Sequence, residues 1–331
     1  MQDFVNRLWY GKPNIGMQLL ILLLLPLSGL FYLISSFRRL LFKLGIKKAQ
    51  KLAVPVIVVG NITVGGSGKT PTVIYLIEML RRHGYRPGVI SRGYGVDFRG
   101  TREVLPGMSP TEVGDEPAMI VARTQVPMVI GRNRVDAAKV LIGSYGVDVI
   151  ISDDGLQHYA LNRDIELLVL DGDRRFGNGY LLPSGPLREG LWRQKEVDFT
   201  IVNGDSCRDN EFLMQLKPGD WQAVQGSQPN ESKVFSIDPH SVAIAGIGNP
   251  QRFFNTLELM GINANKQHAF DDHQAFQLED IIAIAGEHQV LMTEKDAVKC
   301  REFAKQNWWY LPVDAKIDSR FEQQLIAQLQ P

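Results

Sequence analysis

Short apolar segments alternate with amphipathic segments along most of the chain. Continuous apolar runs predict strands at 54–59, 87–91, 128–130, 147–152, 165–170 and 199–202. The spacing of apolar residues between these runs predicts helices at 72–83, 116–124 and 134–145. Strands that are apolar on both faces are typical of parallel sheets covered by helices on each side. The pattern therefore predicts a mostly parallel α/β sheet layered by helices.

A second, smaller α/β pattern follows a change in composition. Glycine, glutamine, serine and proline cluster between Lys217 and Lys233, and strand and helix patterns resume afterwards at 242–247, 251–260, 290–293 and 308–313. A chain of 331 residues exceeds the size at which one core usually keeps growing, so two domains are expected. We therefore divide the chain into an N-terminal anchor with a basic flank (1–52), a larger unit (53–216), a hinge or linker (217–241) and a smaller C-terminal α/β unit (242–331).

The most apolar segment lies near the start. Residues 17–34 carry no charge, and as a helix they would extend about 27 Å against a hydrocarbon core of about 30 Å. Six basic residues and no acid follow: Arg38, Arg39, Lys43, Lys47, Lys48 and Lys51. They predict that the rest of the chain lies on the cytoplasmic side of a membrane and that its surface meets anionic lipid. Pro26 and Gly29 interrupt the run, so a helix that lies partly embedded and a buried core helix remain alternatives.

The overall composition adds little to this picture. The formal net charge is zero, which gives no indication of nucleic-acid binding. The two cysteines, Cys207 and Cys300, match neither a zinc spacing nor a disulfide framework, as suits a reducing compartment.

A glycine-rich loop joins the predicted strand at 54–59 to the predicted helix at 72–83. Backbone N–H groups in such a loop bind phosphate oxygens, the lysine reaches the outer phosphates and the threonine hydroxyl can ligate Mg²⁺. Thr63 stands where the standard pattern has its first glycine. The loop predicts a nucleoside triphosphate as ligand, held by Thr63, Val64, Gly65, Gly66, Ser67, Gly68, Lys69 and Thr70.

Carboxylates occupy positions where they could do chemistry. Asp153 and Asp154 end an apolar strand, so either could hold Mg²⁺ beside a P-loop, although a turn role is the alternative. Asp115 begins a helix, where it could be an N-terminal cap or could accept a proton from a hydroxyl group; the residues alone leave both open. His273 follows Asp272 in a polar loop, where surface polarity is the alternative to an imidazole that supports a carboxylate.

Segment 171–197 is rich in glycine, arginine and proline and is expected to be a long active-site loop. Arg188 is a candidate for neutralising phosphoryl charge and Glu189 for binding metal, and a solvated charged loop is an equally good account. The same loop carries further arginines at Arg174, Arg175 and Arg193. Arg92 and Arg134 follow other strands and could contact an anionic substrate.

Several motifs in fixed order carry a resemblance that spans nearly the whole chain. They are Trp9-Tyr10, the apolar anchor, VGNITVGGSGKTP (59–71), SRGYG (91–95), GDEP (114–117), IISDDGLQH (150–158), PLRE (186–189), FDDH (270–273) and TEKDAVK (293–299). Together they resemble the tetraacyldisaccharide 4′-kinase family. The resemblance implies transfer of the γ-phosphoryl group of ATP, with Mg²⁺, to the 4′-hydroxyl of a tetraacylated glucosamine disaccharide 1-phosphate. It places this reaction at the cytoplasmic face of the Gram-negative inner membrane and implies lipid IV-A as the product.

The resemblance also implies roles for individual residues. Asp115 resembles the catalytic base of the family, and His273 resembles its partner. Other positions match phosphate, Mg²⁺ or active-site groups: Lys69, Thr70, Asp153, Asp154, Arg188 and Glu189. Gln157 and His158 match positions near the site. Asp271 stands where the common form of the histidine motif has proline.

The fold expected from these features is a P-loop NTPase-like α/β sheet with a smaller α/β domain and an N-terminal membrane helix. The expected partners are a lipid A precursor glycolipid and an anionic membrane surface, with no obligatory protein partner. A partitioning ATPase would carry a signature lysine where this chain has Val64. A GTPase would have Asn-Lys-x-Asp where this chain has TEKD at 293–296. A membrane-associated P-loop ATPase or GTPase switch is the alternative to a lipid kinase, and the two missing elements count against it.

Overall fold

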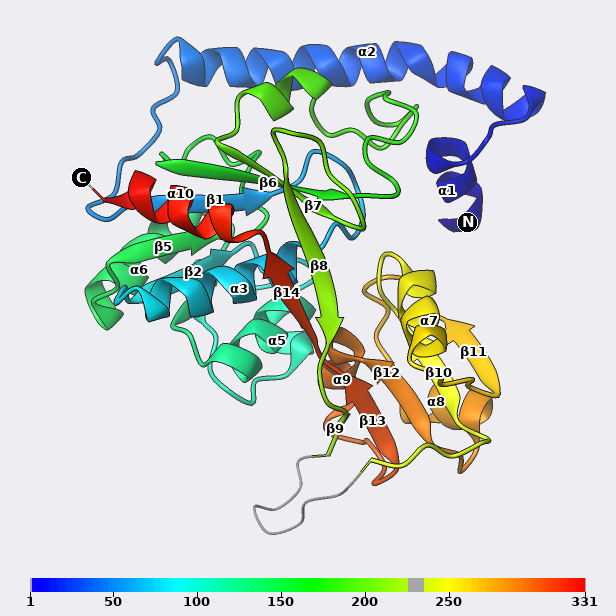
Figure 1. Cartoon of the computed structure of the whole chain (residues 1–331). Coiled ribbons are helices and arrows are strands. Elements are labelled where there is room, and N and C mark those ends of the chain that lie inside the picture. The colour runs from blue at the N-terminus through cyan, green and yellow to red at the C-terminus, as the bar shows by residue number, and fades with distance from the viewer. Residues whose placement is uncertain (1, 226–234, 331) are drawn as a thin grey trace.

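A nine-stranded, mostly parallel sheet forms the framework of the larger unit, with strand order β14-β8-β7-β6-β1-β5-β2-β4-β3 (Figure 1). The computed structural model describes residues 2–225 and 235–330. Only β3 and β14 are antiparallel to their neighbours among the strands described in this sheet. The strands are β1 (Val56–Gly60), β2 (Pro87–Ser91), β3 (Thr101–Glu103), β4 (Met128–Gly131), β5 (Val149–Ser152), β6 (Ile165–Asp171), β7 (Phe199–Asn203), β8 (Phe212–Pro218) and β14 (Val313–Ile317).

Helices cover both faces of this sheet, as its continuous apolar strands predict. Alternate residues of β1 show the two faces: Ile57 packs with α3 (Lys69–Arg82), α5 (Asp115–Thr124) and α10 (Ser319–Leu329). Val58 packs on the other side with α6 (Arg134–Tyr145) and with the loop that follows β5. Two short elements, α4 (Pro110–Val113) and the 3₁₀ helix η1 (Leu191–Lys195), lie in connections. The predicted α/β fold with parallel strands is confirmed.

The smaller unit has its own five-stranded sheet, in the order β11-β10-β12-β13-β9. Helix α7 (Pro250–Leu259) packs on one face, while α8 (Leu278–Ala285) and α9 (Glu294–Cys300) pack on the other. Figure 1 shows this unit in yellow and orange, below the first sheet and to its right. Its strands are β9 (Gln222–Ala223), β10 (Val242–Ala245), β11 (Lys266–Ala269), β12 (Val290–Thr293) and β13 (Trp308–Leu311).

The chain returns to the larger unit at its C-terminal end, which corrects the assignment of all of 242–331 to the smaller unit. Strand β14 pairs with β8 in the nine-stranded sheet, and Phe321 of α10 is fully buried in the core of that sheet. The two units are joined by two adjacent strand connections, β8 to β9 and β13 to β14, where the Gly219 N–H donates to Pro312 O at 2.9 Å. The proposed linker at 217–241 therefore contains strand β9, and its residues 226–234 lie outside the described part.

Two N-terminal helices lie against the larger unit. Helix α1 (Gln2–Tyr10) precedes α2 (Ile15–Lys43), which runs lengthwise along the top of the molecule in Figure 1. Helix α2 is long and apolar enough to cross a membrane. One side of it contacts the core: Ile21 and Ser28 are buried, and the Arg39 guanidinium lies 3.9 Å from the Trp192 ring. The predicted apolar helix is thus present, extended by two turns of basic sequence.

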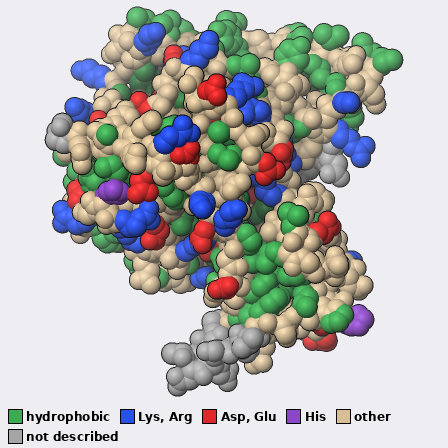
Figure 2. All heavy atoms as spheres, viewed as in Figure 1, with side chains coloured by type: hydrophobic (Ala, Val, Ile, Leu, Met, Phe, Trp, Pro, Cys, Tyr) green, Lys and Arg blue, Asp and Glu red, His purple; other side chains and the backbone are tan. Residues whose placement is uncertain are grey.

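The opposite side of α2 presents a stripe of exposed apolar side chains. Their spacing of three or four residues places them on one helical face, and Figure 2 shows hydrophobic side chains along this edge of the molecule. The stripe consists of Leu19, Leu23, Leu27, Leu30, Ile34 and Phe37.

Candidate functional site

The glycine-rich loop lies between β1 and α3, as predicted, and two of its glycines have backbone angles that other residues rarely adopt. Gly65 has φ +108° and Gly68 has φ +98°. A Cβ at Gly68 would also lie 2.6 Å from Asn203 Nδ2. Lys69 and Thr70 form the first turn of α3, where unpaired backbone N–H groups and the helix dipole favour phosphate.

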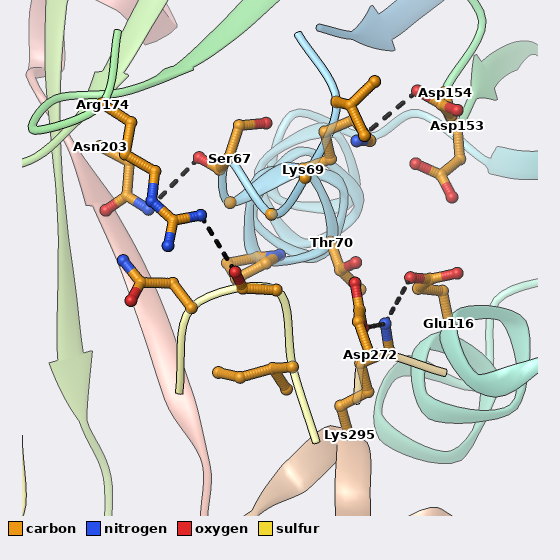
Figure 3. A pocket seen from close by; sticks show the side chains of 18 of the residues that line it. Ser67, Lys69, Thr70, Glu116, Asp153, Asp154, Arg174, Asn203, Asp272 and Lys295 are labelled. Carbon is orange, nitrogen blue, oxygen red and sulfur yellow. Dashed lines mark hydrogen bonds and ion pairs between the residues drawn. The ribbon is translucent and has the colours of Figure 1, made fainter. Parts of the chain in front are cut away.

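Contacts from outside the loop hold it in place. The Val64 N–H donates to Pro186 O at 2.9 Å, and the Tyr10 hydroxyl donates to Val64 O at 3.0 Å. Asn203 Nδ2 donates to Ser67 O at 3.3 Å (Figure 3). Thr63 pairs with Leu187 through an isolated bridge and is buried. The contacts of Tyr10 and Asn203 with the loop could not be predicted from the sequence pattern.

Lys69 and Arg188 converge on Asp154. Lys69 Nζ lies 3.5 Å from Asp154 Oδ1, and Arg188 Nη1 lies 3.1 Å from Asp154 Oδ2 (Figure 3 shows the lysine pair). Burial raises the pKa of Asp154, but the positive charges of Lys69 and Arg188 outweigh it and hold the pKa at about 2. The structure thus brings three predicted site residues together at the start of α3.

Asp153 offers a feature that suits a cation. Its buried Oδ1 atom has no hydrogen-bond partner among the residues that the structure describes, and Asp153 is 5% exposed. Burial, with the negative charges of Glu116 and Asp154, raises the pKa of Asp153 to about 7. An unpartnered carboxylate oxygen beside a phosphate loop fits the oxygen ligands that Mg²⁺ prefers. Of the two adjacent aspartates, Asp153 is the one with an oxygen left free, because Asp154 is paired with cations.

Glu189 is engaged by other side chains. Its carboxylate accepts hydrogen bonds from Gln157 Nε2 at 3.0 Å and from the Tyr159 hydroxyl, and Arg193 Nε lies 3.6 Å away. Within residues 2–225 and 235–330, no three His, Cys, Asp or Glu side chains are grouped so that they could hold a metal ion. The metal-binding role of Glu189 therefore stays a prediction, and its observed contacts hold the 186–193 segment in place.

The three arginines of the long loop other than Arg188 differ in whether an ion pair occupies them. Arg193 pairs with Glu166 and Arg175 pairs with Glu211, so both are committed to structural ion pairs. Arg174 instead faces the phosphate loop and donates from Nη1 to Gly248 O of the smaller unit at 3.0 Å (Figure 3).

The two units meet at Asp115 and His273. Asp115 begins α5 in the larger unit, and His273 follows β11 in the smaller one; its Nδ1 lies 3.3 Å from Asp115 Oδ2. His273 has φ +64°, in a turn where the Gln274 N–H donates to Asp271 O at 3.1 Å. Aspartate at position 271 is thus compatible with the turn that brings His273 to Asp115.

The electrostatic surroundings shift both groups of this pair. Burial raises the pKa of Asp115, but the neighbouring imidazole of His273 and the charge of Lys299 outweigh it and bring that pKa below its usual value. The Asp115 carboxylate in turn raises the pKa of His273, against the effect of burial. An ionised carboxylate beside an imidazole that readily takes a proton can accept a proton from a hydroxyl group.

Two further side chains lie beside the Asp115–His273 pair, and no role was predicted for either from the sequence. Lys295 of α9 lies 2.8 Å from Glu116 and 3.1 Å from Asp272 (Figure 3). The ring of Tyr94 lies 5.2 Å from that of His273. Lys295 belongs to the TEKDAVK motif at 293–299, which was recognised in the sequence. The contacts of its side chain could not be predicted from the sequence.

A basic group surrounds His158 and includes one residue of α2. It consists of Arg38, Arg92, Arg134 and Arg163. Arg134 is 4% exposed and donates to Asp154 O at 2.8 Å. Burial, with the positive charges of Arg134, Arg163 and Arg38, lowers the pKa of His158 to about 4. His158 is thus neutral at pH 7 among several cations, which include Arg92.

One cleft of about 1740 Å³ connects most of these groups. Its lining includes the phosphate loop, Asp153, Asp154, Glu116 and His273, and it extends to Phe31, Ile34 and Arg38 of α2. A single cavity therefore joins a phosphate site, the histidine that contacts Asp115, a basic group and the apolar helix.

Known proteins resemble this chain over nearly its whole length. The family described as LpxK, tetraacyldisaccharide-1-P 4′-kinase, matches residues 20–330. The tetraacyldisaccharide 4′-kinases of Shewanella loihica and Shewanella sediminis are 68% and 63% identical; each alignment covers 99% of this chain, and 97% and 99% of the relatives. The crystal structure of LpxK from Aquifex aeolicus in complex with ATP superposes with a TM-score of 0.78 at 29% identity, over 94% of this chain and 99% of the other. On a match of this extent, the chain belongs to the tetraacyldisaccharide 4′-kinase family.

Proposed function

We propose that this enzyme transfers the γ-phosphoryl group of ATP to the 4′-hydroxyl of a tetraacyldisaccharide 1-phosphate and forms lipid IV-A. The chain is a kinase of the lipid A pathway by family, and a related structure contains ATP. The observation that carries the proposal is the Asp115–His273 pair, whose histidine lines the same cleft as the phosphate loop. A nucleotide switch has no need of a proton acceptor for a sugar hydroxyl group at this place.

Asp115 accepts the proton of the attacking hydroxyl in this proposal. Its buried Oδ2 accepts no hydrogen bond of good geometry within the described residues, so it is free to receive one from the acceptor. His273, 3.3 Å away, stabilises the carboxylate and takes up the proton when the bond to phosphorus has formed.

The loop residues bind and orient the triphosphate. Lys69 and Arg188 exchange part of their contact with Asp154 for the phosphoryl oxygens, where their charges stabilise the transition state. Mg²⁺, when bound, neutralises charge on the outer phosphates. We assign Thr70 and Asp153 to hold the Mg²⁺ ion, because Asp153 Oδ1 has no hydrogen-bond partner within the described part of the chain.

The basic group and α2 place the glycolipid. Arg92, Arg134 and Arg38 surround the part of the cleft beside α2, where the 1-phosphate of the acceptor would find cationic partners. Contacts from Ile21 to Arg39 hold α2 to the core over about 27 Å of its length. We therefore assign α2 to the cytoplasmic face of the membrane, with its apolar stripe embedded and its long axis in the interface.

The test is a transfer assay with the full chain in detergent, using γ-labelled ATP, Mg²⁺ and a tetraacyldisaccharide 1-phosphate. We expect label on the glycolipid, and we expect Asp115→Asn to lower turnover by about 10²- to 10⁴-fold while ATP binding is kept. Label that never reaches the glycolipid would refute the proposed reaction. ATP hydrolysis that proceeds equally well without any acceptor would favour a nucleotide switch.

A further inference from the structure

Two lysines of α9 share one face of the helix and point toward the N-terminus of α5 in the other unit. Lys295 and Lys299 are four residues apart, a spacing that puts side chains on one side of a helix. Lys299 Nζ lies 3.7 Å from Asp115 Oδ2, and Lys295 Nζ lies 2.8 Å from Glu116 Oε1. Two cations of the smaller unit thus face two adjacent carboxylates of the larger unit.

Lys299 is held so that its ammonium group cannot easily move away. Its side chain is 4% exposed, and it donates to Asp296 Oδ1 at 3.2 Å and to Gly246 O at 3.4 Å. The ring of Phe276 lies 4.6 Å below the ammonium group. A buried lysine with these partners is a fixed charge rather than a mobile surface group.

The anchor of Lys299 is itself fully enclosed. Asp296 has no exposed surface, accepts a hydrogen bond from the Gly246 N–H at 3.0 Å and accepts another from the Thr293 hydroxyl at 2.6 Å. The Asp296 carboxylate therefore links the start of α9 to the end of β10, and these bonds fix the position from which Lys299 reaches Asp115.

Lys295 acts on the histidine side of the pair. It lies 3.1 Å from Asp272, the residue before His273, and so links the histidine turn to Glu116 of the larger unit (Figure 3). The charged groups around Asp115 are thus the cations His273, Lys295 and Lys299 and the anions Glu116, Asp272 and Asp296. Lys299 is the cation of α9 that lies closer to the carboxylate.

We propose that Lys299 is a positioning residue for Asp115: it fixes the carboxylate in its ionised form and in the orientation that faces the acceptor, once the smaller unit docks on the larger one. Lys295 secures the same docking through Glu116 and Asp272. This inference rests on the proposed role of Asp115 as proton acceptor. It gives the TEKDAVK segment of α9 a task in turnover, although none of its side chains needs to touch ATP.

The test compares kcat, both KM values and the pH dependence of kcat for Lys299→Met and Lys299→Arg with wild type, using ATP, Mg²⁺ and the tetraacyldisaccharide 1-phosphate. We expect Lys299→Met to lower kcat by roughly tenfold or more, because the carboxylate loses a fixed cationic neighbour. The KM for ATP stays unchanged, and the acidic limb of the kcat profile moves to higher pH. Lys299→Arg, which keeps the charge, recovers a large part of kcat.

Lys305→Met is the matched control, since Lys305 pairs with Glu287 within the smaller unit, and it should behave as wild type. Unchanged kcat and pH profile in Lys299→Met would overturn the inference. So would an equal loss in the Met and Arg variants with an unmoved profile, which indicates packing alone. If Lys299→Met does not fold, as judged by ATP binding, Lys299→Gln replaces it in the same comparison.

The same data separate this inference from the function on which it rests. A wild-type enzyme that labels no glycolipid, or an Asp115→Asn variant as active as wild type, refutes the proposed function. An active wild type and an impaired Asp115→Asn variant, together with a normal Lys299→Met variant, refute the positioning role only.

Discussion

Ser28 is a polar residue in the middle of the apolar helix α2, and its removal should loosen the helix from the core. Its hydroxyl donates to Leu181 O at 2.9 Å and accepts from the Ser184 N–H at 3.1 Å. Leu181 O keeps a second partner, because the Gly185 N–H also donates to it, at 3.0 Å. Ser28→Ala therefore loses the hydrogen bonds of this hydroxyl to Leu181 O and to Ser184 Oγ, 2.8 Å away, and leaves the buried Ser184 N–H group without its partner, a cost of about 2–4 kcal/mol.

Hydrogen exchange of the full chain in detergent would measure this cost. A local destabilisation of 2–4 kcal/mol corresponds to about 30- to 900-fold faster exchange in peptides that cover 181–185. Ser35→Ala is the matched control, since the Ser35 hydroxyl donates only to Tyr32 O of its own helix in the described structure. Equal exchange at 181–185 in the two variants would refute the idea that α2 is fastened to the core at Ser28.

Three further predictions concern the loop, the domain contact and the membrane. Tyr10→Phe removes the donor to Val64 O, worth about 1 kcal/mol, so the Kd for ATP by calorimetry should rise about fivefold; an unchanged Kd would contradict a supporting role for Tyr10. The pKa of His273 is raised from 6.5 and that of Asp115 is lowered from 3.8. The stabilisation that the two charged groups give each other is therefore fully present between pH 3.8 and pH 6.5. It is lost as the pH rises through the folded-state pKa of His273 or falls through that of Asp115. Thermal unfolding from pH 5 to 9 should show the loss on the alkaline side in wild type but not in Asp115→Asn, and identical curves would contradict it. Replacing Leu19 and Leu23, two members of the exposed stripe that are 62% and 75% exposed, by serine should weaken flotation with phosphatidylglycerol vesicles on the order of 100-fold while ATP binding is kept; undiminished flotation would argue against an embedded stripe.

The central strands and the phosphate loop could be predicted from the sequence because local pattern alone determines them. The runs at 87–91 and 290–293 are strands with the predicted bounds, and the helix at 134–145 is also as predicted. Buried parallel strands have no polar alternation, so they stand out from their surroundings. Strand β8 was missed because its sequence mixes Gln215 and Lys217 with apolar residues, as a strand close to the sheet edge allows.

Individual site residues could be named from their motifs, but most contacts between motifs could not. Lys69, Asp154 and Arg188 come from three separate segments, were named from the sequence and do converge. The contacts of Glu189 with Gln157 and Tyr159 were not foreseen, because these partners belong to another segment. The contact between Lys299 and Asp115 depends on docking of two units, and no local pattern encodes that distance.

The return of the last strand and helix to the larger unit has a consequence for synthesis of the protein. Phe321 stacks edge-on with Phe199 and contacts Phe212, so the hydrophobic packing beside β7 and β8 is incomplete without it. On the ribosome, strands β1 to β8 are made before β14 and α10, which belong to the same sheet and core. The larger unit therefore completes its packing only after the smaller unit has been synthesised, and a chain cut before residue 313 would leave the core beside β7 and β8 open rather than lose a dispensable tail.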